Sequence, residues 1–285
     1  MALEQLLAGV PVSVFVEQYY LKLPFSRPGG CKHLAGRAGW PLVEALLRAP
    51  GADFLAARPD GVWPGTGRPS PEEARALLAG GHTLRFRHAE RHDAVLTELA
   101  EGFRRAFLGG VDVHVCCTPA GQPGLGWHYD AEDVFVLQTE GSKEWSLRKN
   151  TVHPWPLPET IPQDMRLERE IMPVLRCDLH AGDWLYVPAG YWHQSRAGAE
   201  SVSLAVGVLS ATAMDVYDFL RARLLDSLQW RQRLPTPGDA SPLGEEELLD
   251  RYRELFAELG RDLADLLGRE RTARDFLRGR GRQVP

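Results

Sequence analysis

The stretch from about residue 111 to residue 210 consists of short β-rich segments separated by turns, and it limits the fold more than any other part of the sequence. Each segment is bounded by Gly, Pro or Asp residues. The clearest segments are Val111–Cys116, Val134–Leu137, Lys143–Leu147, Trp184–Val187 and Ser201–Val206. Short strands at this spacing are typical of an antiparallel barrel or jelly roll. The mouth of such a barrel is a natural place for a small ligand or a metal ion.

The residues before this stretch have a different pattern. Residues 1 to about 95 mix short helical runs, such as Pro41–Leu47 and Pro71–Leu78, with connectors rich in Gly and Pro. Ser70 precedes a first-turn proline, and Glu73 follows at the third helical position, which is the pattern of a capping box. We therefore expect an irregular α/β lead-in that contains a helix starting at Pro71.

The residues after the β-rich stretch have a helical pattern. Apolar side chains recur at helical intervals in Met214–Leu225 and again in Glu247–Leu267, which predicts two helices. The segment Arg231–Gly238 separates them. A basic segment, Arg269–Arg282, ends the chain, and we favour a solvated helix with a frayed end over a binding patch for it.

Length and composition agree with this division. The sequence predicts one domain over residues 1–210, with a barrel core at about 80–210, and a helical region over residues 211–285. With 44% hydrophobic and 25% charged residues, the 285-residue chain has the composition of a soluble globular protein. Its net charge of −5 argues against direct nucleic-acid binding. There is no leader pattern and no apolar stretch of membrane-spanning length, so we expect a cytoplasmic protein that does not bind membranes.

Two motifs in the β-rich stretch can supply a metal site. On a strand, residues two positions apart point to the same side, so His128 and Asp130 can present an imidazole and a carboxylate together. The turn Pro188–Gly190 delivers His193 to the start of another strand, where it can complete the set. Two histidines and one carboxylate on one face, with the opposite positions open, are the ligand set of non-haem Fe(II) oxygenases.

The order of motifs around these residues resembles the Jumonji C (JmjC) family of 2-oxoglutarate oxygenases. The similarity covers about Thr118 to Gly207, and it is stronger to the cupin-like branch of ribosomal oxygenases, which hydroxylate ribosomal proteins. The segments that carry it are Thr118–Gly121, His128–Asp130, Val134–Gln138, Gly141–Trp145, Gly182–Pro188 and His193–Gln194. The resemblance implies that the jelly roll is a cupin-like double-stranded β-helix, mainly β with helical additions, and that residues 1–210 form a catalytic domain.

The resemblance also implies a chemistry. His128, Asp130 and His193 would bind Fe(II), and 2-oxoglutarate and O2 would be the cosubstrates of a dioxygenase that hydroxylates a protein side chain, with a ribosomal protein as the candidate substrate. Lys143 would pair with the distal carboxylate of 2-oxoglutarate, because a buried carboxylate needs a charge-assisted donor. Taken alone, Lys143 would be interpreted as a surface lysine after a turn at Gly141–Ser142.

Other functions stay open at this point. A small-molecule hydroxylase would use the same residues as a protein hydroxylase. A metal-binding cupin that does not use 2-oxoglutarate would not need Lys143. Ribosomal oxygenases follow the barrel with a helical dimerisation region, so we expect the helices after residue 211 to pair two subunits in a homodimer.

The sequence departs from the family pattern at three positions. His114 stands where ribosomal oxygenases often carry an asparagine near the cosubstrate. It lines the pocket or contacts 2-oxoglutarate, or it is a satisfied core histidine. Ala205 stands where the family often has a hydroxyl residue, and Trp127 replaces a small residue or proline before the first ligand. For the nearby histidines His82, His88 and His92, surface or core roles outweigh metal binding.

Overall fold

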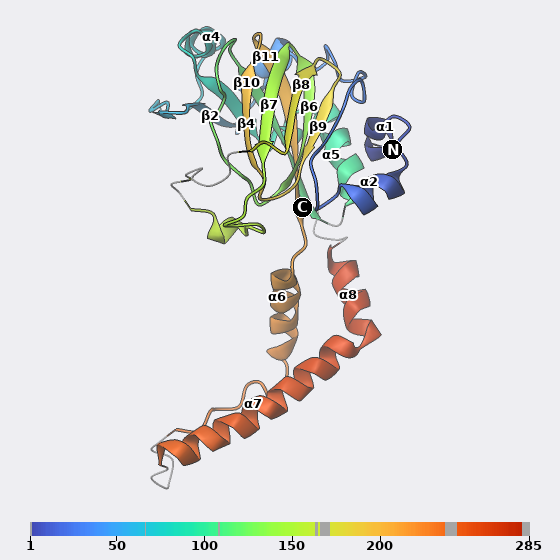
Figure 1. Cartoon of the computed structure of the whole chain (residues 1–285). Helices are drawn as coiled ribbons and strands as arrows, with labels where there is room; N and C mark the ends of the chain where they lie inside the picture. Colours follow the sequence, from blue (N-terminus) through green and yellow to red (C-terminus); the bar gives the residue numbers. More distant parts are fainter. Residues whose placement is uncertain are drawn as a thin grey trace. The chain divides into compact units, whose positions relative to one another are not determined.

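A computed structural model of the chain describes residues 2–65, 67–107, 109–162, 165, 172–236 and 244–280 (Figure 1). It divides into two compact units, Met1–Ser210 and Ala211–Pro285. All strands of the described residues belong to the first unit. Pro237 and Gly238 of the predicted connector, and residues 281 and 282 of the predicted basic tail, lie outside the described residues.

The first unit is built on a large antiparallel sheet. Its eight strands are β1 (Phe25–Arg27), β2 (Asp53–Arg58), β3 (Gly61–Val62), β4 (Thr83–Arg87), β5 (Gly109–Thr118), β6 (Asp133–Glu140), β9 (Trp184–Val187) and β11 (Ser201–Ser210). Their order in the sheet is β1-β9-β6-β11-β5-β4-β2-β3. The N-terminal lead-in is therefore not separate from the barrel, because it contributes β1 to one edge of the sheet and β2 and β3 to the other.

A smaller sheet completes the barrel. Its three antiparallel strands are β7 (Ser142–Arg148), β8 (Leu175–His180) and β10 (Trp192–Ala197), in the order β10-β7-β8. The five strands expected from the sequence are confirmed as β5, β6, β7, β9 and β11. The two sheets form the predicted jelly-roll core (Figure 1).

Alternation along the strands builds a core on each side of the large sheet. On β6, Val134 and Val136 pack against side chains of the small sheet, including Trp145 and Leu147. Phe135 belongs instead to the larger cluster formed with the N-terminal helices. Because successive side chains of a strand point to opposite faces, one strand serves both cores. The inward face of the large sheet is thereby held opposite the small sheet, where the predicted site residues lie.

Helices cover the outer face of the large sheet. They are α1 (Ala2–Leu7), α2 (Val12–Gln18), α3 (Trp40–Arg48), α4 (Pro71–Ala79) and α5 (Ala94–Ala106), with short 3₁₀ turns η1 (Ala89–Arg91) and η2 (Pro158–Thr160) elsewhere in the unit. The predicted start of α4 is confirmed, because Glu73 N donates to Ser70 Oγ at 3.2 Å and Ser70 N donates to Glu73 Oε2 at 2.7 Å. The sequence did not predict α5, although its buried Leu96, Leu99 and Phe103 recur at helical spacing.

The second unit is helical. It contains α6 (Ala213–Leu224), α7 (Glu245–Gly268) and α8 (Glu270–Arg280), which confirms the two predicted helices and the helical tail. None of the described residues of the 24-residue α7 is buried. An apolar cavity of about 520 Å³ lies between α6, α7 and the segment after α6, and Leu220, Leu224 and Leu263 help to line it. No described helix has the length and apolarity of a membrane span.

Candidate metal centre

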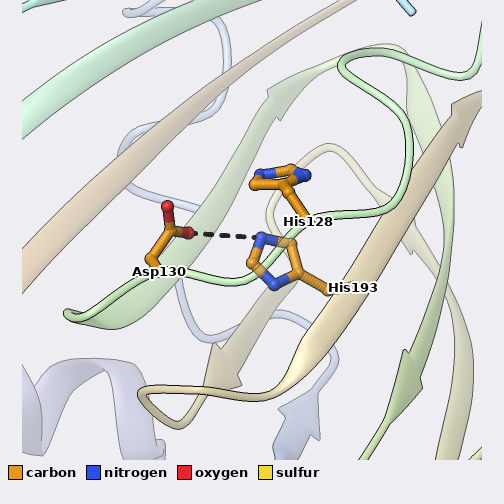
Figure 2. Close-up of side chains that lie close together, drawn as sticks. All are labelled: His128, Asp130 and His193. Carbon is orange, nitrogen blue, oxygen red and sulfur yellow. Dashed lines mark ion pairs between the residues drawn. The ribbon is translucent and has the colours of Figure 1, made fainter. Parts of the chain in front are cut away.

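The structure brings the three predicted ligands together. The ligand atoms of His128, Asp130 and His193 all lie within 4.8 Å of one another, and the three side chains converge on one point (Figure 2). His193 Nε2 is 3.3 Å from Asp130 Oδ2, which is the contact drawn in Figure 2. The two imidazole rings lie with their centroids 4.2 Å apart. Residues from two separate motifs thus form one compact cluster.

One part of the sequence prediction is wrong, because His128 and Asp130 do not lie on a regular strand. His128 forms an isolated β-bridge with His193, and Asp130 follows in the loop before β6. The preceding segment adopts left-handed backbone conformations at Gly124 and Gly126, with φ of 61° and 80°, so it cannot continue a strand. The bridge still fixes the two histidines, since His193 N donates to His128 O at 2.8 Å and His128 N donates to His193 O at 3.1 Å.

The turn before His193 holds the third ligand in place. Gly190 N donates to the backbone oxygen of Asp130 at 2.8 Å. Gly190 has a φ of 79°, and a Cβ at this position would lie 2.9 Å from the oxygen of Pro154. A side chain would therefore be strained and crowded here, which explains a glycine at this turn.

Both histidines have a defined tautomer. The Nδ1 atom of His128 lies 2.9 Å from the oxygen of Gly126, and the Nδ1 atom of His193 lies 2.9 Å from the oxygen of Tyr191. A carbonyl oxygen only accepts, so each Nδ1 carries the hydrogen and each Nε2 keeps its lone pair. A histidine that donates through one nitrogen to the backbone is oriented to bind a metal through the other.

The protonation states of these groups suit a cation. Burial and the neighbouring His193 lower the pKa of His128 to about 4, so this imidazole is neutral at pH 7. Burial alone would raise the pKa of Asp130, but the contact with His193 Nε2 and the nearby His128 and Arg85 lower it below its usual range. A neutral imidazole and a carboxylate in one cluster have the donor set of a divalent metal site.

The cluster opens into a pocket between the two sheets. Its lining includes the three clustered residues and Lys143, together with polar side chains such as Thr83, Thr118 and Ser203 and apolar ones such as Val134, Val136 and Ala205. Lys143 is only 3% exposed, so it is not the surface lysine that its residue type alone would suggest. Burial lowers the pKa of its ammonium group.

Lys143 lacks an anionic partner within the described part of the chain. Its Nζ donates to Ser203 Oγ at 2.9 Å, and no described carboxylate forms an ion pair with it. A buried charge without a partner is unfavourable, so the pocket is suited to a ligand that carries a carboxylate. Ser203 also supplies a hydroxyl group to the pocket that we did not expect from the sequence, two residues before the unusual Ala205.

His114 lines the pocket, and both of its ring nitrogens have hydrogen-bond partners. Its Nδ1 accepts a hydrogen bond from Arg85 Nε at 2.8 Å, and its Nε2 lies 2.9 Å from Asp112 Oδ1. Since Nδ1 is an acceptor, Nε2 must carry the hydrogen and donate it to Asp112. Asp112, His114 and Glu132 form a second cluster of potential metal ligands. His114 has no free lone pair for a metal in this cluster, because Nδ1 accepts from Arg85 and Nε2 carries the hydrogen.

Several residues of the pocket were missed by sequence reasoning. Burial, with Asp112 and Asp130 nearby, raises the pKa of Glu132 to about 7. Trp145 lines the pocket from β7, on the same face of the strand as Lys143. The i, i+2 spacing from Lys143 is a signal that could have identified Trp145.

The other predicted features lie outside the cluster. His82, His88 and His92 do not belong to either group of potential ligands found among the described residues. Trp127 does not line the pocket but stacks with Arg148, whose guanidinium carbon lies 4.4 Å from the indole centroid.

Comparison with known proteins gives this site its family. The family model described as "JmjC domain" matches residues 85–216, which include all three clustered residues and Lys143. Residues 85–216 match a JmjC domain. The predicted resemblance to the JmjC family is thus confirmed, and this domain extends from β4 to the start of α6.

Curated relatives of this chain carry two kinds of name. The bifunctional lysine-specific demethylase and histidyl-hydroxylase NO66 of Dictyostelium discoideum is 29% identical over 74% of this chain and 45% of its own length. Ribosomal oxygenase 1 of Gallus gallus is 26% identical over 81% of this chain and 41% of its own length. The chain thus spans less than half the length of these relatives.

Solved structures of similar fold include the ribosomal oxygenase YcfD from Escherichia coli in complex with cobalt and 2-oxoglutarate. That structure has a TM-score of 0.65 and 18% sequence identity, and the match covers 97% of this chain and 72% of YcfD. The YcfD complex with cobalt and succinic acid matches with a TM-score of 0.60. These matches confirm the predicted cupin-like fold.

Proposed function

We propose that the chain is an Fe(II)- and 2-oxoglutarate-dependent oxygenase that hydroxylates a protein side chain. One observation carries the proposal: a two-histidine, one-carboxylate cluster and a buried lysine without a described carboxylate partner line the same pocket. The names of the relatives, which include hydroxylase and ribosomal oxygenase, support it, as does the YcfD structure that holds cobalt and 2-oxoglutarate.

The residues of the cluster would hold Fe(II). When bound, Fe(II) supplies oxidative chemistry in which O2 converts 2-oxoglutarate to succinate and carbon dioxide while the substrate gains a hydroxyl group. His128 and His193 would bind the metal through Nε2, each kept in the correct tautomer by a backbone carbonyl. Asp130 would contribute a negative charge that partly neutralises a divalent cation.

The opposite end of the pocket would hold the cosubstrate. Lys143 and Ser203 would bind its distal carboxylate, so that the ammonium gains the charge-assisted partner it lacks. Val134, Val136 and Ala205 line the pocket with apolar surface, which limits the access of water around the reacting groups. The role of the protein is thus to orient 2-oxoglutarate and the metal relative to one another.

The remaining alternatives differ in their need for these residues. A metal-binding cupin that does not use 2-oxoglutarate has no use for a buried, unpaired lysine, so Lys143 disfavours it. A small-molecule hydroxylase would use the same metal and cosubstrate residues. The names of the relatives favour a protein substrate, and specifically a ribosomal protein.

The substrate can be identified by mass. We expect one ribosomal protein from cells that contain the enzyme to be heavier by one oxygen atom than the same protein from cells that lack it. Intact-mass spectrometry of all ribosomal proteins measures this difference, and cells that express His128→Ala are the matched control. If every ribosomal protein has the same mass in the three samples, a small-molecule or other substrate replaces this one.

We also propose that the chain is a cytoplasmic homodimer that pairs through residues 211–285. Apolar side chains of this unit remain exposed, among them Tyr217, Leu228 and Phe256, which are 56%, 78% and 60% exposed. A second copy would cover such surface. Light scattering should give twice the monomer mass, and Phe256→Glu with Leu228→Glu should shift the mass toward the monomer. A monomeric mass for the unsubstituted protein would contradict the proposed dimer.

A further inference from the structure

The indole N–H of Trp145 has no hydrogen-bond partner among the described residues, although its nitrogen is buried. The side chain is 8% exposed and lines the pocket that contains the metal cluster. An indole nitrogen can only donate, so the missing partner has to be an acceptor. Buried donors are paired in the great majority of cases, and an unpaired one calls for an explanation.

Other tryptophans of the chain show the usual arrangement. Trp184 Nε1 donates to the oxygen of Leu6 at 2.7 Å, and Trp40 Nε1 donates to Glu44 Oε1 at 2.8 Å. Trp230 Nε1 donates to Asp262 Oδ2 at 2.7 Å. Trp145 differs from these three because it lines the pocket, so a ligand in that pocket is a natural source of its acceptor.

The position of Trp145 indicates which ligand this is. It follows Lys143 by two residues on β7, so both side chains stand on the face of the strand that borders the pocket. The Trp145 ring centroid lies 6.0 Å from that of His193. On β7, Trp145 stands between Lys143 and Leu147, and Leu147 pairs with His193 of β10. Along the strand, Trp145 therefore lies between the buried ammonium and the metal cluster, on the path of a dicarboxylate that reaches from one to the other.

We propose that the Trp145 indole N–H donates a hydrogen bond to the distal carboxylate of 2-oxoglutarate, next to the Lys143 ammonium. This rests on the proposed function, and it assigns to the cosubstrate a further donor, beside Lys143 and Ser203, that the resemblance did not supply. The carboxylate then accepts from an ammonium and an indole on one strand face, so a ligand without a distal carboxylate leaves the indole unpaired.

Two phenylalanine variants separate binding from folding. Trp145→Phe should weaken 2-oxoglutarate binding to the metal-loaded protein by roughly tenfold to a hundredfold, because a hydrogen bond to a charged group is lost. Trp184→Phe also removes a buried indole, but it should leave the dissociation constant within about twofold. The effects on the stability of the metal-free protein should have the opposite order. Trp184→Phe should lower the unfolding temperature more than Trp145→Phe, because Trp184 donates a hydrogen bond to a protein acceptor and Trp145 has none among the described residues.

A spectroscopic measurement tests the hydrogen bond directly. The protein carries ¹⁵N-labelled tryptophan and is loaded with Zn(II), which is diamagnetic and does not turn over. The Trp145 indole resonance is assigned as the one that is absent from the spectrum of Trp145→Phe. It should shift when 2-oxoglutarate is added to the wild type. It should not shift with pyruvate, which keeps the 2-oxo acid group but lacks the distal carboxylate. The same resonance should not shift with 2-oxoglutarate in Lys143→Ala.

The outcomes keep the two proposals apart. If 2-oxoglutarate does not bind the metal-loaded wild type, the proposed function fails. If it binds, but Trp145→Phe binds it equally well and the indole resonance stays in place, the role of Trp145 is wrong while the proposed function stands. A shift of equal size with pyruvate would also overturn the assignment to the distal carboxylate.

Discussion

Replacing either His128 or Asp130 by alanine is expected to abolish metal binding and all conversion of 2-oxoglutarate. Each variant removes one of three clustered donor atoms and leaves two, and divalent metals held by fewer protein ligands dissociate readily. Loss of a residue that merely supports a ligand already lowers metal affinity by about tenfold to a hundredfold, so loss of a ligand should exceed that. Asp130→Ala should have the larger effect, because it also removes the negative charge.

The measurement is the metal content after dialysis against Fe(II) without oxygen, followed by an assay for succinate. The matched control is His33→Ala, whose side chain is exposed and lies outside the pocket. We expect about one metal ion per chain in the wild type and in the control, and none in the two variants. Metal retained at the wild-type level by both variants would place the metal somewhere other than this cluster.

Replacing Lys143 is expected to remove cosubstrate binding while leaving the metal in place. Its ammonium is buried and makes one hydrogen bond among the described residues, to Ser203. A bound carboxylate that loses this partner would stay buried without a counter-charge, which costs about 3–5 kcal/mol and corresponds to a weakening of binding by a hundredfold or more. Lys143→Met should therefore bind Fe(II) normally and 2-oxoglutarate barely.

For the same variant, Lys143→Met, we expect no loss of stability although cosubstrate binding is lost. The ammonium of Lys143 is desolvated in the metal-free protein, and methionine fills a similar volume without a charge. Lys143→Met should therefore unfold at an equal or higher temperature than the wild type when metal and cosubstrate are absent. The control is Lys149→Met, on an exposed side chain, which should change neither property. Wild-type affinity of Lys143→Met for 2-oxoglutarate would show that another residue holds the distal carboxylate.

Local patterns were sufficient to predict the main elements of this fold. Turn residues and β-branched runs located β5, β6, β7, β9 and β11, and a capping box located the start of α4. The edge strands β1 and β3, and β2 beside β3, were not expected. They are short and lie in a segment rich in Gly and Pro, and their strand character depends on pairing with the rest of the sheet.

For the site, too, some residues could be predicted from the sequence and others could not. His128, Asp130, His193 and Lys143 stand in short motifs of fixed spacing, so the sequence could indicate them. The partners of these residues could not be read in that way, because they come from register between distant strands. Ser203 lies opposite Cys116 of β5 and Gln138 of β6, and its hydroxyl group meets Lys143 of β7 across the pocket. The network from Arg85 through His114 to Asp112 depends likewise on the pairing of β4 with β5.

The main incorrect prediction concerned the backbone at His128 and Asp130. Alternation on a strand was a reasonable basis for placing His128 and Asp130 together, but the two residues are held by an isolated bridge to His193 and by the Gly190 turn. Glycines with positive φ prevent a regular strand before them. The side chains still form the predicted cluster. The backbone that supports it is a bridge and a turn, and not the regular strand that was expected.

The central claim is that a single pocket holds a metal at one end and 2-oxoglutarate between that metal and Lys143. Calorimetric titration of 2-oxoglutarate into the protein without oxygen, with and without Fe(II), tests it most directly. The account predicts binding of about one molecule per chain that needs both the metal and Lys143. Absence of binding to the Fe(II)-loaded protein, or equal binding with and without the metal, would contradict it.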